Sequence, residues 1–514
     1  MSAKVCVVGI DAMENLLISK WVADGALPAF ASLKERGAWA DVINPPRRFS
    51  GATWPNVYTG VGPKRHDQYV RTVFNEQDYS WHGLRPSEDK APPFWFQDGW
   101  DQKQIALINV PYAPLSRQIN GMQVINWGVH DCHDMRIQTS PEDLAKEILS
   151  EFGDDPVGLC DIDRRTPDEF CNFRDRLVAR VNAKRDMFLK YLDMRDWDLF
   201  FCVLDEPHCV GHACWHLLDT DNPLNDPETA EIVGNPIKDV YKAIDNALAA
   251  VLERIDDSTT LIVLASHGMG PVQPDKEVLD EVLRRIEGRS TGTSMKGISS
   301  VRHSIGRLPG WVQKRLQPLR EKYAWHINEA MRKRERRDRR YFTIEPQDET
   351  TGIRINLKGR ESHGLVTPGD DYENVVSQLT NELLALVDGA TGEPMVERVR
   401  RREEMDYDGF NGSIPDLVVE WVEKYPGWVE SPTIGRVDPV YYCRTGNHCR
   451  MVGRLAATGP TVAPGQVADP VRLEDLAPSI AKLLDVPIGV TDGSPINQLL
   501  AHKKQNDLAV GPTG

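Results

Sequence analysis

Four short, continuous runs of apolar residues constrain the fold of this chain more than any other feature. They are KVCVVGID at residues 4–11, IALINV at 105–110, WDLFFCVL at 197–204 and TLIVLA at 260–265. A strand that is apolar at nearly every position is covered on both faces, as in a parallel sheet between helices. Ligands bind beyond the carboxyl ends of such strands. The polar residues at these ends, namely Asp11, Asp205 and the pair Ser266-His267, are therefore candidates for a site.

Helical stretches lie between these runs and after them. Residues 167–192 and 238–255 have helical periodicity, residues 375–387 and 471–484 predict two later helices, and residues 417–422 predict a further strand. We therefore expect an α/β fold, namely a three-layer helix–sheet–helix sandwich around a central, mostly parallel sheet.

Residues 275–340 differ in character, because they are basic and end in RKRERRDRR at 332–340. We predict a catalytic core of residues 1–274 and 341–502, interrupted by an inserted basic cap at 275–340 and followed by a disordered tail at 503–514. The basic run predicts a solvated helix face, with a substrate or partner patch as the alternative. Residues 72–93, which include several aromatic residues, are a candidate second loop over the site.

Composition narrows the classes of partner. The net charge of −15 argues against binding to a nucleic acid polymer or an anionic membrane surface, so an anionic substrate would need a local metal ion or arginine. The nine cysteines show no paired spacing, which is typical of reduced thiols in the cytoplasm. The sequence shows neither a signal peptide nor a run of about 20 apolar residues, so we expect a cytoplasmic protein without a membrane span. It does not indicate the oligomeric state.

Thr53 lies in the segment SGATWPNVYTG at residues 50–60. A threonine before an aromatic–proline pair is expected where a loop enters a helix, and the N–H groups of a helix N-terminus attract phosphate. The hydroxyl can therefore act as a nucleophile toward an ester, or it can simply cap the helix. The residues around Thr53 leave both interpretations open.

Four histidines and one aspartate have positions suited to metal binding. His208 and His212 are four residues apart, so a helix places them on one face. His267 follows a buried strand, and His448 lies in the turn-rich segment RTGNH. Asp11 ends the first strand, where a buried carboxylate needs a metal ion or another cation. Taken singly, each histidine is also compatible with ordinary packing.

Together these segments resemble the type I phosphodiesterase and nucleotide pyrophosphatase branch of the alkaline phosphatase superfamily. The resemblance extends from residue 4 to residue 499, apart from the basic insertion. It includes GIRIN at 352–356, TGEP at 391–394, PDL at 415–417 and DLAPSI at 475–480. It implies an alkaline phosphatase-like fold and a hydrolase with two divalent metal ions, commonly zinc, with manganese or another divalent ion as an alternative.

The resemblance also assigns roles to individual residues. It implies that Thr53 is the nucleophile and that Thr53, Asp11 and His267 bind the metal ion that activates it. It implies that His212 and His448 bind the second ion.

Two positions depart from the family pattern. His208 and Ser266 each stand where the family has an aspartate. Nitrogen-rich ligation still suits zinc, but the ion beside the nucleophile loses a carboxylate. The side chains that could make up the difference are Asp205, Glu206, Ser266 itself and His216.

The predicted activity is metal-dependent hydrolysis of a small-molecule phosphoester, of the phosphodiester or nucleotide type, through a covalent Thr53 intermediate. Asn56, in the same motif, is a candidate substrate-binding residue. One alternative is a transferase that passes a phosphoryl or sulfuryl group from Thr53 to an acceptor hydroxyl in a biosynthetic pathway, in which case a sulfate ester is a further possible substrate. A second alternative is a metabolite-binding homologue without activity.

Overall fold

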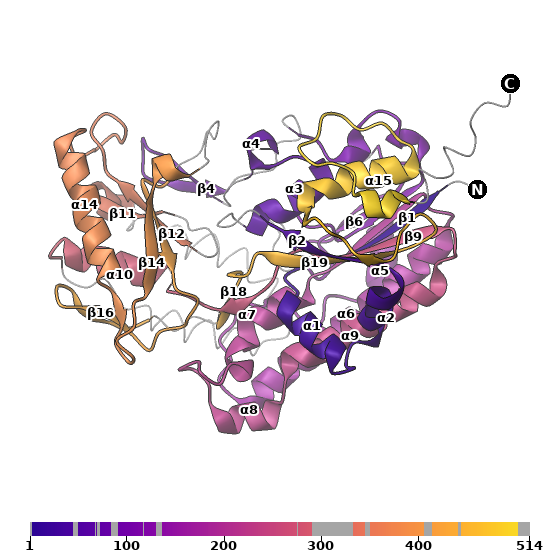
Figure 1. Ribbon diagram of the computed structural model, residues 1–514, viewed down its shortest axis with the longest axis horizontal. Helices are drawn as coiled ribbons and strands as arrows, with labels where there is room; N and C mark the ends of the chain where they lie inside the picture. The colour runs from indigo at the N-terminus through magenta and orange to yellow at the C-terminus, as the bar shows by residue number, and fades with distance from the viewer. Residues whose placement is uncertain are drawn as a thin grey trace.

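The computed structural model describes residues 3–44, 50–66, 68, 72–83, 91–116, 118–129, 136–274, 276–289, 333–344, 350–405, 414–439 and 444–501. Its largest element is a ten-stranded sheet with the strand order β20-β2-β19-β9-β1-β8-β5-β6-β7, in which β21 also pairs with β2 (Figure 1). The strands in this order are β20 (Gly465–Gln466), β2 (Ala38–Ile43), β19 (Val452–Thr458), β9 (Thr259–Ala265), β1 (Lys4–Ile10), β8 (Leu199–Leu204), β5 (Ile105–Ile108), β6 (Gly121–Ile125) and β7 (Gln138–Ser140), with β21 at Val471–Arg472.

The four predicted apolar runs form the middle of this sheet. β9, β1, β8 and β5 lie side by side, and β1 pairs in parallel with both β8 and β9, as β5 does with β8 and β6. Antiparallel pairing occurs where β19 joins β9 and β2, and where β7 joins β6. The sheet is thus mixed but mostly parallel, as predicted.

Helices cover both faces of the central sheet, because alternate residues of each strand point to opposite sides. On one face Val8 and Ile10 of β1 pack in a large apolar cluster with the helices α1, α2, α6, α7 and α9 (Figure 1). These helices are α1 (Asn15–Ala23), α2 (Pro28–Arg36), α6 (Pro167–Met194), α7 (Glu206–Leu218) and α9 (Pro236–Arg254). On the other face Val5 and Val7 pack with α3 (Thr53–Thr59) and α15 (Leu476–Leu484). The predicted three-layer α/β sandwich is confirmed.

The predicted helix at 471–484 begins later than expected. Val471 pairs with Val42 of β2, so the first two residues form the short strand β21. A 3-10 turn, η6 (Leu473–Asp475), then leads into α15. Backbone pairing with the edge of the sheet therefore overrides helical periodicity at these residues.

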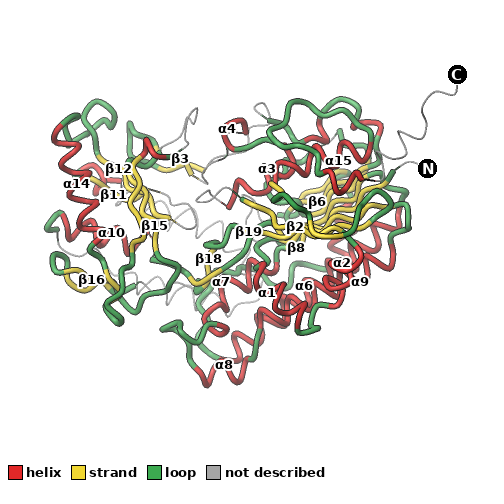
Figure 2. The backbone as a smooth tube through the Cα atoms, viewed as in Figure 1, coloured by secondary structure: helices red, strands yellow, loops and turns green. Residues whose placement is uncertain are grey.

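A second, four-stranded antiparallel sheet lies beside the core, with the order β11-β12-β15-β14 (Figure 2). Its strands are β11 (Tyr341–Ile344), β12 (Thr350–Ile355), β15 (Leu417–Trp421) and β14 (Val396–Arg401). Two helices, α10 (Lys276–Ile286) and α14 (Asp370–Leu384), pack on it and share its own apolar cluster. The predicted strand at 417–422 and the predicted helix at 375–387 therefore correspond to β15 and α14. The strand is part of this second sheet and the helix packs on it, so neither belongs to the central layers.

Shorter elements complete the described structure. The strands are β3 (Thr72–Phe74), β4 (Trp81–Gly83), β10 (Gly270–Pro271), β13 (Val387–Asp388), β16 (Val429–Ser431), β17 (Gly435–Val437) and β18 (Gly446–Asn447), and the helices are α4 (Pro63–His66), α5 (Leu144–Phe152) and α8 (Pro227–Val233). The division at 1–274, 275–340 and 341–502 stays a prediction. Residues 290–332 of the predicted cap and residues 503–514 of the predicted tail lie outside the described residues.

The described part of the basic run is partly exposed and partly packed: Arg334 and Arg340 are exposed, whereas Arg339 is buried. Arg339 is buried and forms ion pairs with Asp280 and Glu287. Lys333 pairs with Asp78 at 2.6 Å, in the β3–β4 hairpin that belongs to the predicted second loop. These two basic side chains thus join α10 and the hairpin to the second sheet, while the exposed side chains of the run agree with the expected solvated face.

Among the described helices, none is by itself long and apolar enough to cross a membrane. Only α1 and α2 taken together reach that length and composition, and they are bent by 93° at the break between them.

Candidate functional site

The carboxyl ends of β1, β8 and β9 lie in register, because Ile10 pairs with the last residue of both neighbouring strands. The residues that follow, Asp11, Asp205 and Ser266, therefore emerge side by side. Backbone hydrogen bonds continue this pairing: Asp11 N donates to Leu204 O at 2.8 Å, and Ser266 N donates to Ile10 O at 3.1 Å. The strand ends thus converge on one edge of the sheet, as the apolar runs predicted.

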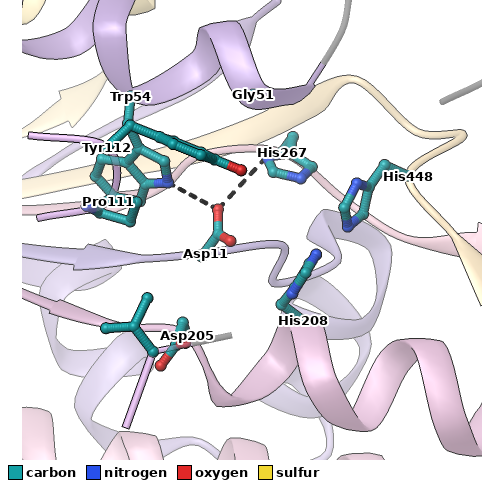
Figure 3. Close-up of a pocket in the computed structure, with 10 residues that line it drawn as sticks. Asp11, Gly51, Trp54, Pro111, Tyr112, Asp205, His208, His267 and His448 are labelled. Carbon is teal, nitrogen blue, oxygen red and sulfur yellow. Dashed lines mark hydrogen bonds and ion pairs between the residues drawn. The ribbon is translucent and has the colours of Figure 1, made fainter. Parts of the chain in front are cut away.

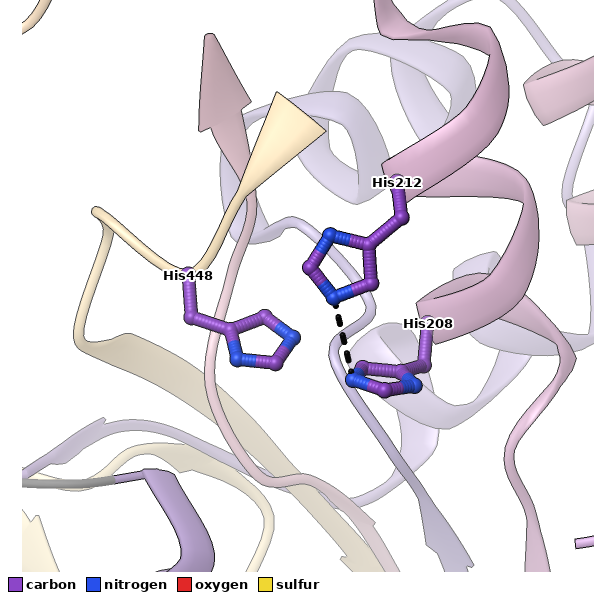
Figure 4. Close-up of side chains that lie close together, drawn as sticks. All are labelled: His208, His212 and His448. Atoms are coloured by element: carbon purple, nitrogen blue, oxygen red, sulfur yellow. Dashed lines mark hydrogen bonds between the residues drawn. The ribbon is translucent and has the colours of Figure 1, made fainter. Parts of the chain in front are cut away.

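His208, His212 and His448 form a buried cluster at this edge (Figure 4). The first two lie one turn apart on α7, which begins directly after β8, and His448 comes from the loop after β18. One ring nitrogen of each lies within 4.8 Å of the others, and Nε2 of His208 is 3.2 Å from Nε2 of His212. Two imidazole nitrogens face each other at this distance only with a proton or a cation between them, and three neutral imidazoles are a set that suits zinc.

The ring of His212 is oriented by its backbone surroundings. Its Nδ1 lies 2.7 Å from the carbonyl oxygen of Gly446, to which it donates, so Nε2 is the nitrogen that can bind a metal ion. Thr445 N donates to His212 O at 2.6 Å, and Gly446 pairs with Pro271 in the β10–β18 ladder. The loop that carries His448 is therefore fastened both to α7 and to the segment that follows His267.

Gly446 permits the close approach of this loop to α7. A Cβ atom at that position would lie 2.4 Å from the carbonyl oxygen of Gly211 and 2.8 Å from Cβ of Trp215. Any larger residue would push the loop away from the helix. The glycine at 446 is thus part of what brings His448 to the other two histidines.

A second group of side chains surrounds Asp11 (Figure 3). Trp54 Nε1 donates to Asp11 Oδ1 at 2.9 Å, and Ser266 Oγ donates to the same oxygen at 3.2 Å. Ser266 Oγ also lies 3.0 Å from Nδ1 of His267, whose own distance to Asp11 Oδ1 is 3.9 Å. The structure therefore brings Asp11, Ser266 and His267 together, and adds Trp54, which we had not assigned a role.

One cavity connects the two groups. Its polar lining includes Asp11, His208, His267 and His448, and its opposite wall includes Gly51, Trp54, Pro111 and Tyr112 (Figure 3).

Thr53 is 2% exposed and is the first residue of α3, between the cavity-lining residues Gly51 and Trp54. The helix N-cap is Ala52, and no side chain caps this end. The structure thus does not support the alternative in which Thr53 serves as the helix cap.

Asp205 and Glu206 are engaged by buried cations. Lys184 and Arg180 of α6 are both 0% exposed; the ammonium of Lys184 binds Asp205 and lies 2.8 Å from Glu206 Oε1, and Arg180 Nε lies 2.8 Å from the same oxygen. Burial by itself lowers the pKa of Lys184, but the two carboxylates raise it above its ordinary value. Both acids thus offset the buried charges of Lys184 and Arg180, while Asp205 also lines the cavity.

His216 and Asn56 also lie apart from the histidine cluster. His216 Nδ1 is 3.0 Å from the hydroxyl of Thr445, and burial lowers the pKa of His216 to about 4. Asn56 is buried with both ends of its amide occupied: Oδ1 lies 2.7 Å from His66 Nε2, and Nδ2 donates to Glu474 at 3.2 Å. The structure therefore ties Asn56 to the packing of α3 and does not support the substrate-binding role that we expected.

Two charged residues that we had not singled out lie beside the site. Arg444 Nη1 is 3.4 Å from His212 Nε2, while the rest of its guanidinium forms a two-point pair with Asp161 at 2.8 and 3.0 Å. The buried carboxylate of Glu14 accepts from Met269 N at 2.9 Å and so holds the loop after His267. The position of Arg444 in RTGNH was the only sequence signal for either residue.

Comparisons with known proteins show the family to which this chain belongs. The similar solved structures include an inactive variant of murine ectonucleotide pyrophosphatase/phosphodiesterase 5 in complex with AMP (14% identity, 96% of this chain and 97% of that chain, TM-score 0.48). They also include phosphonoacetate hydrolase from Sinorhizobium meliloti in complex with phosphonoformate (14% identity, 94% and 96%, TM-score 0.48) and human ectonucleotide pyrophosphatase/phosphodiesterase 5 (15% identity, 97% and 99%, TM-score 0.49). No curated protein sequence matches the chain. The sequence profile of type I phosphodiesterase/nucleotide pyrophosphatase matches residues 5–429, which is most of the chain. The protein therefore belongs to the type I phosphodiesterase/nucleotide pyrophosphatase family of hydrolases, in the alkaline phosphatase superfamily.

Proposed function

We propose that this protein hydrolyses a phosphodiester of a small metabolite, with Thr53 as the nucleophile and a divalent metal ion, zinc in the first instance, held by His208, His212 and His448. The observation that carries the proposal is the buried histidine cluster, whose ligand nitrogens face one another across a distance that requires a cation or a proton. A divalent ion bound there supplies stabilisation of negative charge on a substrate oxygen.

The cavity contains the groups that the chemistry needs. In the proposed first step Thr53 Oγ bonds to phosphorus, the ester bond to the leaving alcohol breaks, and a base in the cavity accepts the hydroxyl proton. Asp11 and His267 line the same cavity as the neighbours of Thr53, and both can accept that proton. Water then cleaves the phosphothreonine and restores the hydroxyl.

Local positive charge opposes the negative field of the whole chain. The net charge of −15 repels an anionic ester at long range. Arg444 lies 3.4 Å from His212 and is held by its ion pair with Asp161, so it adds a guanidinium group beside the proposed ion site. The apolar wall formed by Trp54, Pro111 and Tyr112 suits the organic part of the ester.

We extend the proposal to a cytoplasmic location. The seven cysteines in the described part of the chain form no disulfide, which fits a reducing compartment.

The test combines metal analysis with two nitrophenyl substrates. Purified protein is analysed for bound metal and assayed on bis(p-nitrophenyl) phosphate and p-nitrophenyl phosphate, together with Thr53→Ala and Thr53→Ser. We expect Thr53→Ala to lower turnover by about 10³-fold or more with fold and metal content unchanged, and Thr53→Ser to retain measurable activity. Normal turnover by Thr53→Ala would refute the nucleophile.

Two other outcomes would favour the alternatives. Transfer of the phosphoryl group to an added alcohol in preference to water, or turnover of p-nitrophenyl sulfate alone, would favour the transferase. Metal-free protein that is inert toward every ester would favour the binding protein.

A further inference from the structure

Ser266 occupies the centre of the group around Asp11. Its side chain is 0% exposed, and its hydroxyl lies within hydrogen-bond distance of both Asp11 Oδ1 (3.2 Å) and His267 Nδ1 (3.0 Å). Trp54 Nε1 donates to the same oxygen of Asp11 at 2.9 Å. These side chains therefore hold one another through neutral donors directed at a single carboxylate. Figure 3 shows Trp54 and His267 on either side of Asp11.

We infer that the protein retains one divalent metal ion per chain, at His208, His212 and His448, and that Asp11, Ser266 and His267 form a hydrogen-bonded cluster that does not retain a second. This inference rests on the metal site of the proposed function. It replaces the two-ion expectation that came from the family resemblance.

Ligand number supports the inference. Beside Thr53, a second ion would find good donor atoms on Asp11 and His267, whereas protein zinc sites use three or four ligands. The neutral hydroxyl of Thr53 is a weaker third donor, and Asp205, which lines the same cavity, is paired with Lys184. A serine hydroxyl that donates its proton to a carboxylate is a poor ligand. Within the described residues, the three histidines are the one group of at least three His, Cys, Asp or Glu side chains whose ligand atoms lie close enough to share an ion.

Electrostatic repulsion between neighbouring metal ions also supports the inference of a single ion. The ring of His267 lies 4.7 Å from that of His448, so an ion on His267 would be close to an ion on the histidine cluster. Two neighbouring dications repel each other unless anionic ligands lie between them. Asp11 is the single carboxylate of the Asp11–Ser266–His267 cluster, and the histidine cluster contributes none.

The acidic side chains near this cluster already form contacts of their own. Asp205 and Glu206 neutralise Lys184, which is fully buried, and moving either carboxylate to a metal ion would leave that cation exposed to the apolar interior. Glu14 accepts hydrogen bonds from the backbone of Met269 and Leu16. Each of these acids would have to give up or share such a contact to take the place of a carboxylate at 266.

The test counts metal ions and compares three full-length variants. Wild type, Ser266→Asp, Ser266→Ala and His212→Ala are saturated with zinc, desalted and analysed by mass spectrometry of the metal. We expect about one ion per chain for wild type and Ser266→Ala, about two for Ser266→Asp, and less than half an ion for His212→Ala.

Thermal unfolding provides the folding control. A second carboxylate beside Asp11 repels it when no metal is bound, so Ser266→Asp should have a lower Tm than Ser266→Ala in a chelator. Added zinc should then raise the Tm of Ser266→Asp by more than it raises that of wild type.

The outcomes separate this inference from the proposed function. Two ions retained by wild type, or one ion in a folded Ser266→Asp, would overturn the inference and leave the phosphodiesterase proposal standing. One ion in a wild-type protein that hydrolyses no ester would support the inference and refute the activity. A wild-type protein that retains no zinc would overturn both.

Discussion

The indole Nε1 of Trp54 donates a hydrogen bond of 2.9 Å to Oδ1 of Asp11, and this bond joins α3 to the end of β1. The ring can lie against the strand because residue 9 is glycine: a Cβ there would be 2.5 Å from the six-membered ring of Trp54. The residue next to Thr53 therefore sets the orientation of the carboxylate that shares the cavity.

Replacing Trp54 with phenylalanine tests this link. Phe keeps an aromatic ring in the packing but removes the donor, so Asp11 loses the hydrogen bond from the indole. We expect kcat/KM on bis(p-nitrophenyl) phosphate to fall about tenfold or more, the size typical for loss of a partner that orients a site residue. The metal content should stay unchanged.

Trp95 supplies the matched control for that substitution. It is also buried, and its Nε1 has no hydrogen-bond partner among the described residues. Trp95→Phe should leave kcat/KM as in wild type. Equal activity in both variants would show that the bond to Asp11 does not matter for turnover.

Lys184 should be essential for stability. Lys184→Met leaves the buried carboxylates of Asp205 and Glu206 with less compensation, so we expect the free energy of unfolding to fall by about 3–5 kcal/mol. Urea denaturation measures this change. Lys190→Met, on the same helix, removes partly exposed ion pairs with Glu147 and Glu151 and should cost about 1 kcal/mol or less. Similar losses in the two variants would mean that the buried network contributes no more than a surface pair.

Gly446→Ala should displace the loop that carries His448. The added methyl group would meet Gly211 O at 2.4 Å, so the backbone must move. We expect a stability loss of about 1–3 kcal/mol and at least roughly tenfold weaker zinc binding, measured by thermal unfolding and competition with a chromophoric chelator.

Gly427→Ala is the control for Gly446→Ala. The nearest heavy atom to a Cβ at 427 is 3.5 Å away, at ordinary contact distance. This variant should change stability by no more than about 0.5 kcal/mol and leave zinc affinity unchanged. Unaltered zinc affinity in Gly446→Ala would show that the loop adjusts without moving His448.

His216 should make stability depend on pH in the acid range. Burial lowers its pKa from 6.5 to about 4, so between these values the unfolded chain binds a proton that the folded chain does not. The contribution of neutral His216 to the free energy of unfolding is therefore fully present above pH 6.5 and is lost as the pH falls to about 4. The total loss is roughly 3 kcal/mol.

His216→Gln isolates this contribution. Glutamine does not titrate, so the unfolding free energy of the variant should decline less than that of wild type between pH 6.5 and 4. The two curves should run parallel above pH 7.5. Parallel curves across the whole range would contradict a neutral, buried His216.

The sequence by itself determined the architecture of the core and where several polar residues of the candidate site would meet. Apolar runs at β1, β8 and β9 predicted a parallel sheet, and the residues after them predicted where Asp11 and His267 converge. The spacing of His208 and His212 placed both on one face of a helix. These features could be predicted because strand burial and helix periodicity depend on residues a few positions apart.

Only the tertiary structure decided which polar side chains serve the site and which serve the packing. Asn56 lies in the Thr53 motif, yet the structure ties it to Glu474, 418 residues away. Asp205 is adjacent to the histidine helix, yet it neutralises Lys184 on α6. The hydroxyl of Ser266 lies between Asp11 and His267, within hydrogen-bond distance of both. Such pairings depend on how distant elements pack, because a buried charge or hydrogen-bonding group takes whichever partner the fold brings within about 3 Å.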